Sequence, residues 1–151
     1  MKLEHKYIRA ILLMLALSIS SIICAQDDLS INSIFNKYGK QKGATMVVMS
    51  GKALREYKLS KYQSITISYD KTILKEIQNS IEKDKQGANK IKEVVNNGIV
   101  SSGYYQLLKN DDNLERYILF KIGTESRVTI IYIEGGVDSD KLIERLFLKS
   151  E

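Results

Sequence analysis

"YYQLLKNDDNLERYILFKIGTESRVTIIYIE", residues 104–134, contains three short apolar segments separated by two polar turns. The segments are 104–109, 114–122 and 127–134, and the turns between them read NDDN and GTES. Connections this short join antiparallel strands, because a parallel pair needs a crossover of a dozen residues or more. The stretch therefore predicts an antiparallel meander and a fold built on a sheet.

Two of these strands are apolar on both sides, within 117–122 and within 130–133. Antiparallel sheets commonly bury one face and leave the other in water. Either a further segment covers the second face, or that face is a contact surface.

Three other segments carry apolar residues at helical spacing. They are 31–38 after Ser30, 71–85 after Asp70, and a last segment capped by Asp138 or Ser139 with Leu142, Ile143, Leu146 and Phe147 as its apolar face. Ser and Asp are favoured helix N-caps. Gly39 is expected to end the first helix in a left-handed conformation, and Gly87 to break the second.

The remaining chain adds strands. Residues 44–50 form a short apolar run that ends at Gly51, and residues 64–69 alternate between apolar and polar side chains. Between them, 52–62 is ambiguous and can hold one helical turn. The pair Asn97–Gly98 is either a type I′ hairpin turn or the end of a short helix; the β-branched residues on both sides favour the hairpin.

These elements predict an α+β fold with a single antiparallel sheet of about five strands. Roughly three helices would pack mainly on one face, in the order α-β-β-α-β-β-β-α. No repeat or linker interrupts the chain, so residues 26–151 are expected to form a single domain.

Residues 1–25 have the pattern of a secretory signal peptide. A basic start is followed by an uncharged apolar run, 10–23, that is shorter than the ~20 residues of a membrane-spanning helix. Cleavage after Ala25 would remove three basic residues and one acid, which lowers the net charge from +5 to +3. No transmembrane segment is expected after cleavage, and the protein is expected to be periplasmic or secreted.

Cys24 leaves two alternatives to that cleavage. An uncleaved leader would act as an N-terminal anchor, and a lipidated Cys24 would make the protein a lipoprotein. A bacterial lipobox usually has Gly, Ala or Ser before the cysteine, and here Ile23 is bulky. Removal of Cys24 with the leader is therefore the preferred interpretation.

Within residues 26–151 there is no His, Cys, Trp or Pro, because His5 and Cys24 are the only copies of their kind. This composition excludes imidazole-activated nucleophiles, zinc bound by Cys or His, and thiol redox chemistry. No cofactor, metal ligand or catalytic residue is predicted. Any catalysis would need carboxylates, lysine, tyrosine or an oxygen-ligated metal.

Three short motifs suggest chemistry but lack the required residues. "MSGKA" at 49–53 fails as a phosphate loop, because Met46 replaces its first glycine and Ala53 its Ser or Thr. The acidic clusters 110–113 and 138–140 lack the layout of a calcium loop and are typical of turns and caps. Lysines over 71–92 alternate with acids as on a solvated helix, so no nucleic acid is expected.

Tyrosine is the main aromatic residue of the chain. Its apolar ring and polar tip suit recognition surfaces, but tyrosines also line the margins of cores. Tyr104, Tyr105 and Tyr117 lie on adjacent predicted strands and form the first candidate group for recognition.

The segments "INSIFNKYGKQKGATMVVMSGKAL" (31–54), "LERYILFKI" (114–122) and "VTIIYIEGGVDSDKLIERLF" (128–147) resemble small exported domains of unknown function from Gram-negative gut bacteria. The resemblance implies export and this order of helix, strand and final helix. It brings no catalytic motif.

The composition and the fold together favour a non-enzymatic module of the cell envelope. It would bind a protein, a glycan or an envelope component through an exposed sheet face or edge. One alternative is a carboxylate- or lysine-dependent enzyme acting on an envelope polymer. Another is a structural subunit of a homo-oligomer, held together at an apolar sheet edge.

Overall fold

The computed structural model describes residues 29–136, 141 and 143. The predicted signal peptide, the 138–140 cluster and most of the predicted final helix lie outside these residues. Lys141 and Ile143 are helical, as predicted for that segment.

The described chain forms one antiparallel sheet with helices, so the α+β prediction is confirmed. The sheet has six strands in the order β1-β2-β6-β5-β4-β3, one more than predicted. The elements in chain order are α2 (Ile31–Tyr38), β1 (Thr45–Ser50), α3 (Lys52–Arg55), β2 (Leu59–Ser68), α4 (Lys71–Asp84), β3 (Lys90–Asn96), β4 (Ile99–Gln106), β5 (Glu115–Ile122) and β6 (Arg127–Gly135).

The extra strand comes from the 88–106 segment. Asn97 and Gly98 both have positive φ, as a type I′ turn requires, and they join β3 to β4. The predicted hairpin is therefore confirmed. The strand predicted over 104–109 is wrong in its bounds, because β4 runs without interruption from Ile99 to Gln106.

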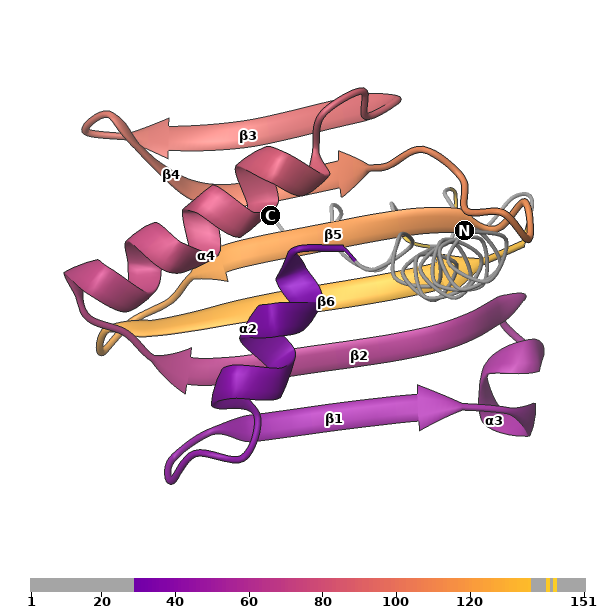
Figure 1. Cartoon of the computed structure of the whole chain (residues 1–151), viewed down its shortest axis with the longest axis horizontal. Coiled ribbons are helices and arrows are strands. Elements are labelled where there is room, and N and C mark those ends of the chain that lie inside the picture. The colour runs from indigo at the N-terminus through magenta and orange to yellow at the C-terminus, as the bar shows by residue number, and fades with distance from the viewer. Residues whose placement is uncertain (1–28, 137–140, 142, 144–151) are drawn as a thin grey trace, which may run out of the picture.

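Strands β1 and β3 form the two edges of the sheet, and β6 lies at its centre between β2 and β5 (Figure 1). The meander β4-β5-β6 is confirmed. The pairing of β2 with β6 brings together segments about sixty residues apart in the chain, and Thr66 and Thr129 share a 2.9 Å hydrogen bond across it.

Helices α2 and α4 cover the same face of the sheet (Figure 1). Their apolar sides, with Ile34, Phe35 and Ile77 fully or nearly fully buried, pack on Ile65, Ile130 and their neighbours. Asp70 caps α4 as predicted, and its Oδ1 accepts a 2.8 Å hydrogen bond from the backbone of Ile73.

The start of α2 differs from the prediction. The side chain of Ser30 makes no capping hydrogen bond. Instead the carboxylate of Asp84, at the end of α4, accepts hydrogen bonds from the backbone N–H of Ser30 at 2.7 Å and of Ile31 at 2.8 Å. The first turn of one helix is thus capped by the last turn of the other.

The end of α2 also differs. Gly39 is right-handed, with φ −62°, so the predicted left-handed cap is wrong. A Cβ on Gly39 would collide with Sδ of Met46 and with the carbonyl oxygen of Phe35. Glycine is needed here for the close approach of β1 to α2.

The opposite face of the sheet carries a second apolar cluster. Its members are Leu54, Leu59, Tyr104, Tyr117, Leu119, Ile133 and Ile143, with Tyr62 and Ile131 packed against them. Leu54 of α3 and Ile143 contribute side chains to this cluster. The two longer helices, α2 and α4, share one face, as predicted, and the predicted element order is corrected because α3 lies between β1 and β2. The strands that are apolar on both sides reflect the two clusters.

Candidate functional site: the β1 edge and its basic flanks

The outermost strand β1 presents apolar side chains to solvent. Val47, Val48 and Met49 are consecutive, and 42%, 58% and 40% of their surfaces are exposed. Among the described residues, β1 pairs only with β2, so its other side offers free backbone N–H and C=O groups. Three adjacent exposed apolar residues are unusual on a soluble surface without a function.

Strand β1 also lacks the features that usually protect an edge. Its register with β2 runs from Thr45 to Ser50 without a shift, and none of its residues is charged. Natural proteins blunt edges with charges, bulges and proline. The six residues of β1 therefore form an uncharged edge strand without a register shift.

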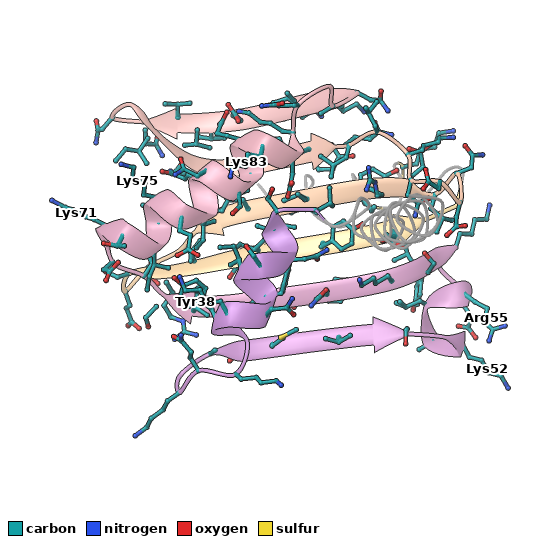
Figure 2. The ribbon with its side chains drawn as sticks, in the orientation of Figure 1. Tyr38, Lys52, Arg55, Lys71, Lys75 and Lys83 are labelled. Atoms are coloured by element: carbon teal, nitrogen blue, oxygen red, sulfur yellow. The ribbon has the colours of Figure 1, made fainter. Side chains whose placement is uncertain are left out.

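Basic residues lie on both sides of this strand in the chain. Lys40 and Lys42 precede β1, Lys52 and Arg55 follow it, and all four side chains are exposed. None of the four forms an ion pair with any residue that the structure describes. Figure 2 shows Lys52 and Arg55 extending outward at the end of β1.

The short helix α3 fixes this arrangement. Leu54, on its inner side, is 4% exposed and packs in the second apolar cluster. Lys52 and Arg55, three residues apart, share the outer side. Gly51 joins β1 to α3 with φ 77°, a conformation that favours glycine. The "MSGKA" motif is therefore a strand-to-helix turn.

The tyrosine group proposed from sequence does not form a recognition surface. Tyr104 and Tyr117 pack together in the second apolar cluster with ring centroids 6.1 Å apart and ring planes tilted by 32°. Tyr105 lies on the other face, in the main core beneath α2 and α4. All three are buried. The structure thus places these tyrosines in the two cores. Tyr57, which follows α3, is the exposed tyrosine near β1, and sequence alone gave no reason to single it out.

A polar cluster joins α2 to α4. Glu76 accepts hydrogen bonds from Tyr38 Oη at 2.7 Å and from Lys37 Nζ at 2.8 Å. The bond from Lys37 lowers the pKa of Glu76, and the same bond raises the pKa of Lys37. Burial, followed by the bond to Glu76, raises the pKa of Tyr38. Each shift moves the group away from neutrality, whereas proton-transfer catalysts are tuned toward it.

Another polar cluster, centred on Glu93, joins β3 to α4. Glu93 accepts hydrogen bonds from Lys85 Nζ at 2.8 Å and Tyr105 Oη at 2.9 Å, and Lys85 also pairs with Glu82. The bond from Lys85 lowers the pKa of Glu93. Burial opposes the charge of Lys85, but its two carboxylate partners raise its pKa. Burial, and then Glu93, raises the pKa of Tyr105. This cluster, too, suits stability better than proton transfer.

Among the described carboxylates, Asp84 is the one whose pKa is raised, because it is partly buried between α2 and α4. Its oxygens accept the two backbone hydrogen bonds at the start of α2. Those bonds give it a structural role as a cap.

The acidic turn 110–113 is a turn, as predicted: Asn110 Oδ1 accepts a hydrogen bond from the backbone of Leu114 at 2.9 Å. Within the described residues, no three His, Cys, Asp or Glu side chains gather in a way that could hold a metal ion. In the same part of the chain, no helix has the length and apolarity needed to cross a membrane.

A family model described as "Family of unknown function" (DUF6108) matches residues 18–146. No curated protein matches the sequence significantly.

Proposed function

The chain belongs to the family of unknown function DUF6108, and we propose that it is a non-enzymatic, exported binding module that receives an extended segment of a partner protein along β1. The segment would pair with β1 as a seventh strand of the sheet. Such strand addition gives affinity through main-chain hydrogen bonds and specificity through alternate side chains.

One observation carries this proposal: β1 is an uncharged edge without a register shift, and its side chains are exposed. The two sheet faces leave less accessible surface for a partner than the β1 edge does. One is covered by α2 and α4, and the other holds a second buried cluster. Of the two modes predicted from sequence, a sheet face or a sheet edge, the edge is favoured.

An N-acetylated and C-amidated peptide with the sequence Ser-Ser-Thr-Val-Thr-Val-Thr-Val-Ser-Ser tests strand addition without contributing charge. We expect titration into the full-length chain to shift the backbone amide NMR signals of β1 and β2, and not those of β3. Two further peptides carry N-methyl groups on the odd-numbered or on the even-numbered residues. Only one of the two should lose binding, because alternate N–H groups point to opposite sides and one side of the peptide pairs with β1.

A matched pair of variants locates the interaction. Val48→Lys places a charge on the β1 edge, and Val95→Lys places the same charge on β3, where Val95 is 55% exposed. We expect Val48→Lys to weaken the uncharged peptide at least about tenfold, and Val95→Lys to leave it unchanged. Equal loss in both variants, or no β1 shift in the wild type, would contradict the proposal.

Export rests on the leader-like residues 1–25 and is tested separately. The mass of the protein recovered from its natural host should correspond to a chain that begins at Gln26. A diacylated Cys24 would show that the protein is a lipoprotein and not a free exported domain. A cytosolic chain that retains Met1 would contradict export.

The alternative of a carboxylate- or lysine-dependent enzyme acting on an envelope polymer has less support from the described residues. The ionisable clusters around Glu76 and Glu93 are mutually hydrogen-bonded, and their pKa values lie further from neutrality than usual. Asp84 is committed to capping α2.

A further inference from the structure

We infer that the segment received by β1 carries acidic side chains at both ends and an uncharged, largely apolar centre. This inference rests on the proposed strand addition and specifies its partner. It follows from three properties of the β1 edge: its length, its side chains and the charges at its two ends.

The length of β1 defines the centre of the partner. Six residues of strand span about 20 Å. A segment that pairs with all of β1 and reaches past both ends therefore needs about ten residues in extended form. Shorter segments would leave one basic flank without a contact.

The side chains of β1 define the chemistry of that centre. Val47 and Met49 pair with Ser64 and Tyr62 and lie on the face of the second cluster, whereas Val48 lies on the face of α2 and α4. An added strand would place its own alternate side chains beside these residues on both faces. Uncharged β-branched or aromatic residues fit there, and a charged residue would lose hydration beside Val48 or Met49.

The flanks define the ends. From Gly39 to Lys58, five residues are basic and Glu56 is the single acid; the basic residues are Lys40, Lys42, Lys52, Arg55 and Lys58. They lie before and after the strand, and none lies within it. Complementary charges at the two ends of a bound segment would steer association and fix its position along β1.

A second copy of this chain fits the same edge poorly. Two β1 strands pair antiparallel about a two-fold axis, which places the first end of each beside the last end of the other. Lys40 and Lys42 of one copy would then lie near Lys52 and Arg55 of its partner. Like charges across both ends disfavour the dimer and favour an acidic partner.

The test compares three peptides that share the centre Thr-Val-Thr-Val-Thr-Val and differ in their flanks: Asp-Glu, Ser-Ser or Lys-Arg at both ends. Binding to the full-length chain is measured by fluorescence anisotropy at about 20 mM and about 300 mM salt, since added salt screens exposed charges. We expect the acidic peptide to bind at least about tenfold more tightly than the Ser-Ser peptide at low salt, and the advantage to shrink at high salt.

Charge reversal at the flanks provides the internal control. Lys42→Glu combined with Lys52→Glu should transfer the preference to the Lys-Arg peptide. Lys71→Glu combined with Lys75→Glu makes the same change in net charge on the exposed side of α4, away from the β1 flanks (Figure 2). The α4 variant should keep the preference for the acidic peptide.

The outcomes separate the two proposals. If no peptide shifts the β1 amides, strand addition fails and this inference fails with it. If all three bind within about twofold of one another at both salt concentrations, strand addition stands and the acidic partner is wrong. If sedimentation shows a dimer that Val48→Lys dissolves, the occupant is a second copy and the inference is overturned.

Discussion

The two edges of this sheet are built differently, although both carry exposed valines. Strand β1 has three consecutive exposed apolar residues, no charge and no register shift. Strand β3 carries Lys90, Lys92 and Glu93, and its pairing with β4 shifts register between Val94 and Val95. Charges and bulges are the usual devices that prevent edge pairing. The β3 edge is thus protected, and the β1 edge is open.

The edges also differ in how they are held. Glu93 on β3 is bound by Lys85 of α4 and by Tyr105 of β4. Strand β1 has no such polar side-chain anchor among the described residues; besides its pairing with β2, Met46 packs against Gly39 and the main apolar cluster. The β3 edge thus has side-chain hydrogen bonds in addition to its pairing with β4, whereas β1 has its pairing with β2 and apolar packing. The predictions that follow test this difference, from the largest expected effect to the smallest.

Removing the Tyr105 ring, which anchors β3, should lower the free energy of unfolding more than any other change proposed here. Tyr105→Ala leaves a cavity in the main core and deletes the hydrogen bond to Glu93, so we expect the free energy of unfolding to fall by about 3–5 kcal/mol. Urea denaturation measures the loss. Tyr57→Ala, at an exposed tyrosine near β1, is the control and should stay within about 0.5 kcal/mol. Equal losses would show that Tyr105 is not the anchor.

Adding a methyl group at the contact between Gly39 and Met46 of β1 should lower the free energy of unfolding by a smaller amount. Gly39→Ala forces a methyl group against Met46 and the Phe35 carbonyl, and we expect a loss of about 1–3 kcal/mol. Gly123→Ala is the matched control, because a Cβ there meets no atom closer than 3.6 Å. Thermal unfolding of both variants measures the difference, and a neutral Gly39→Ala would mean that β1 does not depend on this contact.

Acid should loosen β3 and leave β1 unaffected. The pKa of Glu93 is lowered in the folded state, so its stabilisation is present above its unfolded pKa of about 4.3 and is lost as pH falls through the folded value. The effect should not exceed about 1 kcal/mol, because the Lys85–Glu93 pair is partly exposed. Hydrogen exchange, corrected for its intrinsic pH dependence, should show β3 amides losing protection below about pH 4. Glu93→Gln should remove that change; an equal change in β1 would contradict the assignment.

The smallest change in the free energy of unfolding is expected for a substitution on the open β1 edge. Val48→Thr should change the free energy of unfolding by less than about 0.5 kcal/mol, because the side chain is largely exposed. Val95→Thr should behave alike. A loss above about 1 kcal/mol in Val48→Thr alone would show that another segment covers β1, and strand addition would then lack a free edge.

Local patterns predicted much of this fold correctly. The helices over α2 and α4, the Asp70 cap, the Asn97–Gly98 turn and the β4-β5-β6 meander follow from residues close together in the chain. Period and turn chemistry act locally, so they can be read without knowing the partners of each element.

The errors fall where distant segments meet. Ser30 has the right chemistry for a cap, but Asp84 arrives from fifty-four residues away and takes its place. Gly39 has the right position for a left-handed cap, but Met46 makes a close approach the stronger requirement. The tyrosines at 104, 105 and 117 were predicted as one group, and the alternation of β4 sends Tyr105 to the opposite face.

The sequence by itself determined the α+β class, the antiparallel meander and the absence of His and Cys after Ala25, because these depend on composition and on spacing along the chain. Only the tertiary structure decided which strands became edges and which side chains shared a core. Strand order depends on the long-range pairing of β2 with β6, and no local pattern encodes that pairing. The open edge at β1, flanked by basic residues, exists because that pairing places β2 inside the sheet and leaves β1 outside.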